Sequence, residues 1–228
     1  MVQCIDPLRQ DWDWGQIERI FGRNSGRGLT MTTKPRFRDA DIRPVLRSRL
    51  IDKHAGDPET VFIEELGLCR GKVRIDLAAV NGILHGYEIK SDRDSLRRLV
   101  GQIEVYSRVV DRATLVVGER HLPKILKLVP PWWEILRIDS NSPNPRIRSV
   151  RRGRKNPGRD PRSLVELLWL DEAISLLEKI DATRGVKGKP RSFVWDRICE
   201  LFNIDEIAET VRKHLKMRVR PTNPPLPL

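Results

Sequence analysis

The sequence predicts an α/β domain with a mixed central sheet, followed by a small bundle of helices. Up to about residue 140, segments with apolar residues at helical spacing alternate with short β-rich runs. The pair Asn81-Gly82 joins two of these runs, as is typical of an antiparallel hairpin. A helical segment then separates the hairpin from a further apolar run of strand length, which is the pattern of a crossover between parallel strands.

The first elements are one helix and three strands. A helix is expected over residues 39–53, where Ile42, Leu46 and Leu50 recur at helical spacing and face the core. Pro44 falls in the first turn of this helix, where its missing N–H is tolerated. Three β-rich runs of strand length follow, at residues 60–66, 73–80 and 83–90.

The next elements return the chain to the sheet. A helix is expected to begin at Ser91 or Asp92, because acidic residues in a first turn favour a helix start. The apolar run at 113–118 is typical of a buried strand. A short helix at 121–129 and a last strand at 132–138 complete the domain.

Composition changes divide the chain into five parts. Residues 141–162 are rich in proline and arginine and lack apolar periodicity, so a basic linker is expected there. Three later apolar segments predict helices that pack around Trp169, Trp195 and Phe202. The expected parts are a loosely ordered extension (1–37, with Met31 as an alternative start to Met1), the α/β domain (38–140), the linker (141–162), a helical satellite domain (163–218) and a proline-rich tail (219–228).

The charge of the chain points to a polyanionic partner. The formal net charge is +12, and a basic surface attracts nucleic acid through its long-range field and through counterion release. Cys4, Cys69 and Cys199 form no CxxC pair and suggest no disulfide framework, which fits a reducing compartment. No apolar stretch has the length of a signal peptide or a membrane span. We therefore expect a soluble, cytoplasmic protein.

Three charged residues in the predicted hairpin indicate a functional site. Asp76 lies in the second predicted strand, and Glu88 and Lys90 lie in the third, two positions apart and therefore on one face. An unpaired ion away from water is costly, so three charged residues in half-buried strands suggest a functional site. Two carboxylates from neighbouring strands suit Mg²⁺, which activates water, and a nearby lysine can position that water. This is the chemistry that phosphodiester hydrolysis requires.

The register of the hairpin decides whether these residues meet. A strict two-residue turn would put Asp76 on the opposite sheet face from Glu88, because side chains alternate along a strand. A three-residue loop or a bulge would instead pair Val80 with Leu84 and place Asp76 opposite Glu88. The site hypothesis therefore predicts the longer loop.

The segments RID and EIK, with a helix and a strand before them and a helix after them, resemble the PD-(D/E)XK nuclease superfamily. The resemblance implies a restriction-endonuclease-like αβββαβ core, with Asp76 and Glu88 as Mg²⁺ ligands and Lys90 as a catalytic residue. Mn²⁺ can take the place of Mg²⁺. Ile75 stands where the motif name has proline, at a position that is lax in the superfamily. Further segments over residues 38–140 are similar to an uncharacterised bacterial family within it.

Two weaker candidates surround this motif. Gln102 and Tyr106 are similar to the Q-x-x-x-Y element of exonuclease-like members, which implies that Gln102 assists catalysis and Tyr106 contacts nucleic acid. Their spacing puts both on one helix face, and the alternative is that Tyr106 belongs to the core with Gln102 at its border. Glu65 is a further candidate metal ligand and Glu64 points to the opposite face; an edge-strand carboxylate in water is the alternative for Glu65.

Basic residues beside the motif and in the linker are the expected phosphate contacts, and a solvated surface is the alternative. They are Arg93, Arg97 and Arg98 after the third strand, and Arg151, Arg152, Arg154 and Lys155 in the linker.

The leading hypothesis is a Mg²⁺-dependent nuclease that hydrolyses nucleic acid, in the first place DNA. One alternative is a catalytically inactive DNA-binding protein that acts as a partner in a repair, phage or mobile-element assembly. Its support is the same charge and a helix pair at residues 192–215 with the pattern of a helix-turn-helix. Another alternative is an interaction module whose helical bundle binds a second copy of the chain or another protein.

Overall fold

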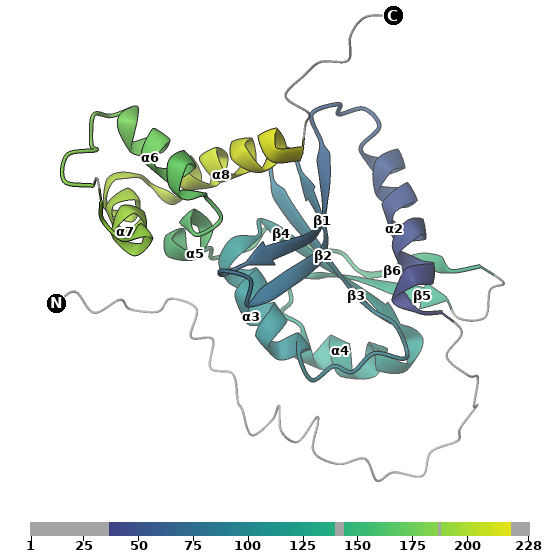
Figure 1. Ribbon diagram of the computed structural model, residues 1–228. Helices are drawn as coiled ribbons and strands as arrows, with labels where there is room; N and C mark the ends of the chain where they lie inside the picture. The colour runs from purple at the N-terminus through teal and green to yellow at the C-terminus, as the bar shows by residue number, and fades with distance from the viewer. Residues whose placement is uncertain (1–36, 140–143, 187, 220–228) are drawn as a thin grey trace, which may run out of the picture.

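A mixed six-stranded sheet with the order β1-β2-β3-β4-β5-β6 forms the centre of the computed structural model (Figure 1). The structure describes residues 37–139, 144–186 and 188–219. Met31, nearly all of the predicted N-terminal extension and the tail from residue 220 lie outside these described residues. The strands are β1 (Val61–Leu68), β2 (Val73–Val80), β3 (Leu84–Lys90), β4 (Arg112–Gly118), β5 (Glu134–Asp139) and β6 (Arg146–Arg151).

Helices cover both faces of this sheet (Figure 1). They are α2 (Asp39–Lys53), α3 (Leu99–Val109), α4 (Leu122–Leu128), α5 (Pro161–Val165), α6 (Leu170–Glu178), α7 (Arg191–Leu201) and α8 (Ile204–Val219), with a short 3₁₀ turn, η1 (Glu119–His121), before α4. One buried cluster lies between the sheet and α2, with Leu46 and Tyr87 among its members. The other joins the opposite face to α3, α4 and the C-terminal helices. The prediction of an α/β fold with a mixed sheet is confirmed.

Strand directions follow the predicted connections. β1, β2 and β3 pair antiparallel, β3, β4 and β5 pair parallel, and β6 returns antiparallel to β5. The two parallel pairs are reached through α3 and through η1 with α4, because a parallel pair needs a long crossover. Buried β3 and β4 thus lie in the middle of the sheet, where a charged side chain is expensive to keep.

The hairpin between β2 and β3 has the longer of the two predicted loops. Val80 pairs with Leu84, which leaves Asn81, Gly82 and Ile83 as a three-residue loop. The Asn81 side chain stabilises this loop, because its Oδ1 accepts from the Ile83 N–H at 3.0 Å. The register that the site hypothesis requires is therefore confirmed.

The helix predicted from Ser91 begins later, at Leu99. The acidic residues that suggested an earlier start make local turns instead, since the Asp94 carboxylate accepts from both the N–H and the hydroxyl of Ser91. Asp92 packs against the end of β4, where a Cβ on Gly118 would approach Asp92 Oδ1 to 2.2 Å. Residues 91–98 therefore form an ordered loop that carries Arg97 and Arg98.

The predicted basic linker at 141–162 is wrong over residues 146–151 and 161–162, which belong to a strand and to a helix. Residues 146–151 form the edge strand β6, which pairs with β5. Its arginines alternate with only a few apolar residues, so the strand pattern is weak in the sequence. Charge on an edge strand opposes pairing with other sheets. Asn156 is buried, and its side-chain Nδ2 donates to the carbonyls of Ser107 and Val110 at 2.7 and 2.8 Å. The sheet unit therefore extends beyond residue 140.

The C-terminal helices share the core of the sheet rather than forming a separate satellite. Leu164, Trp195 and Val211 belong to the same buried cluster as strand residues such as Leu115. The first of the three predicted C-terminal helices is divided into α5 and α6. Trp169 has an extended backbone before α6, and its N–H donates to Glu172 Oε2 at 2.8 Å. Trp169 is exposed, so its predicted place in the core is wrong.

Candidate active site

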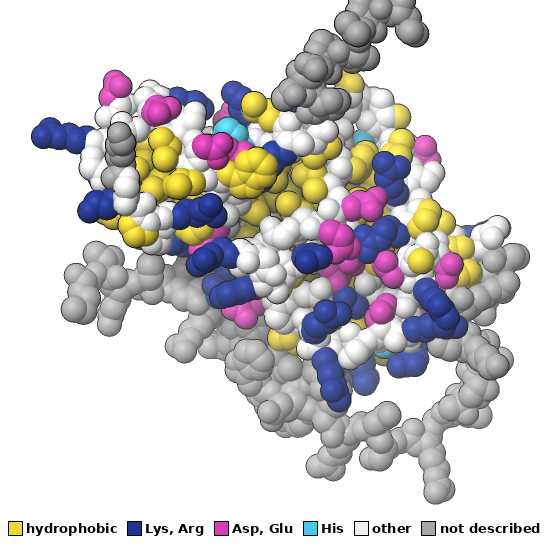
Figure 2. Space-filling model, viewed as in Figure 1, with side chains coloured by type: hydrophobic (Ala, Val, Ile, Leu, Met, Phe, Trp, Pro, Cys, Tyr) yellow, Lys and Arg dark blue, Asp and Glu magenta, His cyan; other side chains and the backbone are white. Residues whose placement is uncertain are grey.

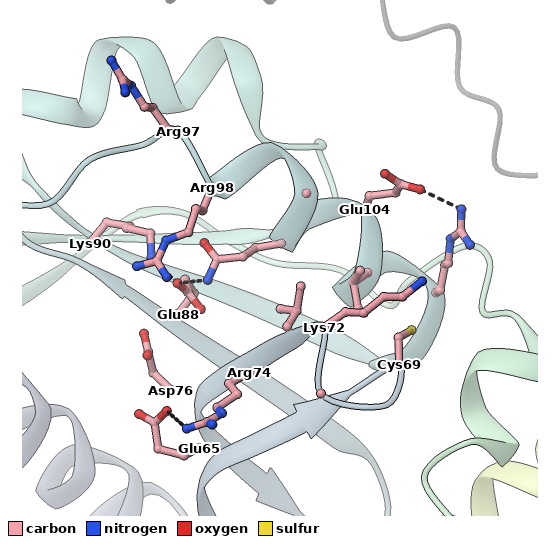
Figure 3. A pocket seen from close by; sticks show the side chains of 16 residues that line it. Glu65, Cys69, Lys72, Arg74, Asp76, Glu88, Lys90, Arg97, Arg98 and Glu104 are labelled. Carbon is pink, nitrogen blue, oxygen red and sulfur yellow. Dashed lines mark hydrogen bonds and ion pairs between the residues drawn. The ribbon is translucent and has the colours of Figure 1, made fainter.

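The candidate site lies where β2 separates from β3. Their regular pairing ends at Leu77 and Tyr87, one position before Asp76 and Glu88. Beyond that point a side chain replaces a backbone acceptor, because Asp76 Oδ2 accepts from the Ile89 N–H at 2.7 Å. Figure 3 shows Asp76, Glu88 and Lys90 side by side around one cavity. The structure thus brings together the three residues of the predicted motif.

Glu88 is the most buried carboxylate of the site, with only 1% of the residue exposed. Its Oε1 is bound by the Lys90 ammonium and by Gln102 Nε2, the latter at 2.6 Å. Its Oε2 accepts from the Tyr106 hydroxyl, which also lies 3.1 Å from the Arg74 carbonyl oxygen. A buried charge requires such partners, and here an ammonium and two neutral donors supply them.

Gln102 and Tyr106 both point from α3 to Glu88, as their spacing predicts. Tyr106 is fully buried and stacks on Trp133, with 5.5 Å between the ring centroids. Burial, and then the nearby Glu88 carboxylate, raise the pKa of the Tyr106 phenol well above its ordinary value, so it stays a hydrogen-bond donor. Tyr106 therefore orients Glu88, and its predicted contact with nucleic acid is replaced by this buried role.

Asp76 carries an altered acidity. Burial, and then repulsion from Glu88, raise the pKa of the Asp76 carboxyl from 3.8 to about 6. Hydrogen bonding from Ile89 and the positive charges of Lys90 and Arg43 oppose this rise. Two carboxylates that repel one another in a partly buried place are stabilised by a shared cation.

This shift predicts a pH dependence that separates wild type from Asp76→Asn. The folded protein holds a proton on Asp76 up to about pH 6, whereas the unfolded chain releases it near 3.8. The contribution of Asp76 to stability is therefore largest below the unfolded pKa and is lost as the pH rises through the folded pKa. From pH 4 to pH 7, the unfolding free energy of wild type should therefore fall by up to about 3 kcal/mol relative to that of Asp76→Asn. Urea unfolding of both proteins across this range measures it, and parallel curves would contradict the raised pKa.

Arg43 of α2 is a site residue that the sequence motif did not reveal. Its Nη1 donates to the Asp76 carbonyl oxygen at 2.6 Å, and its Nη2 lies 3.4 Å from Asp76 Oδ1. The same Nη2 lies 3.0 Å from Asp39 Oδ2 and 3.2 Å from Glu65 Oε1. The regular basic and apolar pattern of α2 does not distinguish this arginine from Arg47 or Arg49, because its partners are far away in the sequence.

Glu65 lies beside the motif but is held by arginines. Glu65 lies between the pairs Glu64–Leu77 and Leu66–Ile75 and has no ladder partner of its own. Its backbone has φ +54°, in the left-handed region that non-glycine residues rarely adopt. Its carboxylate faces Arg43 and, at 4.0 Å, Arg74. The prediction that Glu65 points into the site is supported by its place in the cavity lining, whereas its ionic partners are the two arginines.

The cavity over this site has a volume of about 870 Å³ and a mixed charged lining. Besides Asp76, Glu88 and Lys90, it is lined by Glu65, Lys72, Arg74, Arg97, Arg98, Gln102, Glu104 and Arg108. Figure 2 shows Lys and Arg side chains around a group of acidic ones on this face. The sequence predicted Arg97 and Arg98 at the site. It did not single out Lys72, Arg74 or Arg108, which reach the cavity from the β1–β2 hairpin and from the end of α3.

The other predicted phosphate contacts are not part of the cavity lining. Arg151 is a structural residue, because its guanidinium donates to the carbonyls of Val129, Pro130 and Trp133 at 2.7–3.2 Å. Arg93, Arg152, Arg154 and Lys155 are exposed outside the cavity. These residues are therefore separate from the surface formed by Arg97 and Arg98.

The donor set suits a magnesium ion held by few protein ligands. Within the described ranges, no group of three or more His, Cys, Asp or Glu side chains is arranged to hold a metal. Asp76 and Glu88 remain as a pair, with a repulsion that a cation would relieve. Mg²⁺ is commonly bound through one or two carboxylates, with water and phosphate as its other ligands. The residues present thus fit Mg²⁺, whereas they do not form a closed cage.

None of the described helices is both long enough and apolar enough to cross a membrane.

Comparison with known proteins places the chain in a phage-related family. Protein cII of Enterobacteria phage P4 is 31% identical over 96 residues, which are 42% of this chain and 36% of that protein. The chain therefore matches just over a third of the length of this relative. A solved protein of unknown function from Silicibacter pomeroyi covers 70% of this chain and 98% of its own, with 20% identity and a TM-score of 0.37. A family profile described as bacteriophage P4 protein cII matches residues 34–226, and the chain belongs to that family.

Proposed function

We propose that this protein is a Mg²⁺-dependent nuclease that hydrolyses phosphodiester bonds in DNA. The observation that carries the proposal is the meeting of Asp76, Glu88 and Lys90 at one cavity lined by further basic side chains. The order α2, β1, β2, β3, α3, β4 also agrees with a restriction-endonuclease-like core. The acids of β2 and β3 lie where these two strands part.

The chain supplies three kinds of group for hydrolysis. Asp76 and Glu88 are the residues that would hold Mg²⁺, which supplies activated water and neutralises phosphate charge. Lys90 is almost buried beside Glu88, and its ammonium can donate to a water molecule or to a phosphate oxygen in the cavity. Gln102 holds Glu88 through its amide nitrogen, and its buried Oε1 has no partner among the described residues. That oxygen can accept a hydrogen bond from a water molecule.

Basic side chains around the cavity supply the binding of the substrate backbone. Lys72 and Arg74 lie on one side, and Arg97 and Arg98 lie on the other (Figure 3). Contacts of this kind position a phosphate chain and carry no sequence information by themselves. No aromatic side chain occurs among the described residues that line the cavity, so stacking on bases is not part of this binding mode. We infer recognition of the backbone without strong sequence preference.

A cleavage assay tests the proposal. Wild type, Asp76→Asn and Asp52→Asn are incubated with end-labelled single-stranded and duplex DNA, in Mg²⁺, in Mn²⁺ and in EDTA. Cleavage is expected for wild type with either metal and to be lost in EDTA and in Asp76→Asn, because this change removes a metal ligand and a charge. Asp52 is exposed at the end of α2, so Asp52→Asn should cleave as wild type does. Cleavage that survives in Asp76→Asn would contradict the proposed site.

A second function, binding of DNA without cleavage, is favoured by one observation. Both oxygens of Glu88 already have protein partners, and Arg43 binds the carboxylate and the carbonyl of Asp76. A site satisfied in this way can serve as a rigid support for a basic surface. Salt-dependent DNA binding by wild type, with no cleavage in Mg²⁺ or Mn²⁺, would favour this second function over the first.

A further inference from the structure

Arg43 is surrounded by carboxylate and carbonyl oxygens, the kind of donor that divalent cations also prefer. Three carboxylates, from Asp39, Glu65 and Asp76, lie 3.0, 3.2 and 3.4 Å from its Nη2. The Asp76 carbonyl oxygen lies 2.6 Å from its Nη1. These oxygens come from α2, β1 and β2, so one guanidinium joins three elements at the edge of the site.

The burial of this group distinguishes it from an ordinary surface ion pair. The Arg43 side chain is 20% exposed, as is that of Asp76, whereas its neighbour on the same helix, Arg47, is 52% exposed. Among the described residues, Arg47 meets a single carboxylate, that of Glu64, at 3.6 Å. Glu65 reaches Arg43 from a left-handed backbone position, so the chain adopts a strained conformation where this contact is made.

Asp76 has a carboxylate and a cation on each of two sides. Figure 3 shows Asp76 between Glu88 and Glu65. Toward Glu88 lie the ammonium of Lys90 and the cavity, and toward Glu65 lies the guanidinium of Arg43. As they stand, the carboxylates of Asp39, Glu65 and Asp76 are arranged around a guanidinium and not around a metal ion. Without Arg43 they would face one another with no cation between them, and a divalent ion could draw them together.

We propose that the Arg43 guanidinium takes the place of a second divalent cation, so that the site binds a single ion between Asp76 and Glu88. This inference rests on the proposed function, because it assumes that the first ion binds. It also assigns Glu65 to Arg43 rather than to the metal. Arg43 is then a positioning residue, which holds Asp76 by its carbonyl and its carboxylate and supplies a fixed positive charge.

Counting bound Mn²⁺ tests the proposal without DNA and without cleavage. Wild type, Arg43→Met and Arg47→Met are titrated with Mn²⁺ to millimolar concentration, with free Mn²⁺ measured by electron paramagnetic resonance. One bound ion is expected for wild type and for Arg47→Met, and two for Arg43→Met, because removal of the guanidinium opens a position among three carboxylates. Thermal unfolding by circular dichroism verifies that each variant is folded.

The outcomes separate this proposal from the proposed function. One ion in wild type and one in Arg43→Met, even if bound more tightly, would overturn the role of Arg43 and leave the nuclease site intact. No ion in wild type would overturn both. Glu65→Gln gives a second test that does not depend on how Arg43→Met folds: it should keep the single ion, since Glu65 is not its ligand. Loss of the ion in Glu65→Gln would overturn the proposal.

Discussion

Replacing Asp111 by alanine is expected to lower the free energy of unfolding by about 3–5 kcal/mol, because it leaves buried cations without their partner. Asp111 is 4% exposed and lies immediately before β4. Its Oδ1 lies 2.7 Å from Arg159 Nη1, and its Oδ2 lies 3.5 Å from Arg212 Nη1. Oδ2 also accepts from the Leu84 N–H at 2.8 Å. One carboxylate therefore ties β3, the segment before α5 and α8 together.

Urea unfolding followed by circular dichroism measures this loss, and Asp205→Ala is the matched control. Asp205 is the other partner of Arg159, at 2.6 Å, but its side chain is 79% exposed. Water replaces an exposed partner of this kind at small cost, so Asp205→Ala should unfold close to the wild-type midpoint. Equal midpoints for the two variants would show that Asp111 does not hold the C-terminal helices to the sheet.

The hairpin of β2 and β3 shows what the sequence predicts well. Strand runs, the Asn81-Gly82 turn and charged residues two apart are all local signals. The first and the last depend on strand geometry, which repeats every two residues. The choice between a two-residue and a three-residue loop required a further premise, that Asp76 and Glu88 share a face. The observed pairing of Val80 with Leu84 agrees with that premise.

The arginine-rich segment shows why the remainder of the fold was harder to predict. The local composition of β6 does not distinguish it from a solvated linker, because an edge strand needs only a few apolar contacts and tolerates charge. Arg159 is almost wholly buried, and what allows this is Asp111, which lies 48 positions earlier in the chain. No local pattern contains that pairing, and the same holds for Arg43 with its partners in β1 and β2.

The loop before α3 was mispredicted for a different reason. Asp92 and Asp94 suit the first turn of a helix, but short acidic side chains equally bind backbone N–H groups in turns. Tertiary contact decides between these outcomes, because Asp92 Oδ1 accepts from the Arg120 N–H at 3.0 Å beyond the end of β4. The consequence for the site is that Arg97 and Arg98 stand on an ordered loop beside Lys90 rather than on a helix.

Lys90→Met is expected to lower the rate of DNA cleavage at saturating DNA by about 10²- to 10⁴-fold, the usual loss when a positioned donor at the reacting group is removed. Met preserves most of the length of the side chain and removes the charge. Glu88 keeps its hydrogen bonds from Gln102 and Tyr106, so the buried carboxylate is still partly satisfied. Single-turnover rates in Mg²⁺ measure the effect, and DNA affinity in EDTA should change little.

Lys72→Met is the matched control, because it removes an ammonium from the same cavity at a place remote from Glu88. Lys72 is exposed at the β1–β2 hairpin and lines the cavity without contact to the carboxylate pair. Its loss should weaken DNA binding and reduce the slope of log affinity against log salt by about 1, with the saturated rate close to wild type. If both lysines changed only affinity, Lys90 would be a further phosphate contact. If Lys90→Met alone abolished the saturated rate, its ammonium would act on the reacting phosphate or the attacking water.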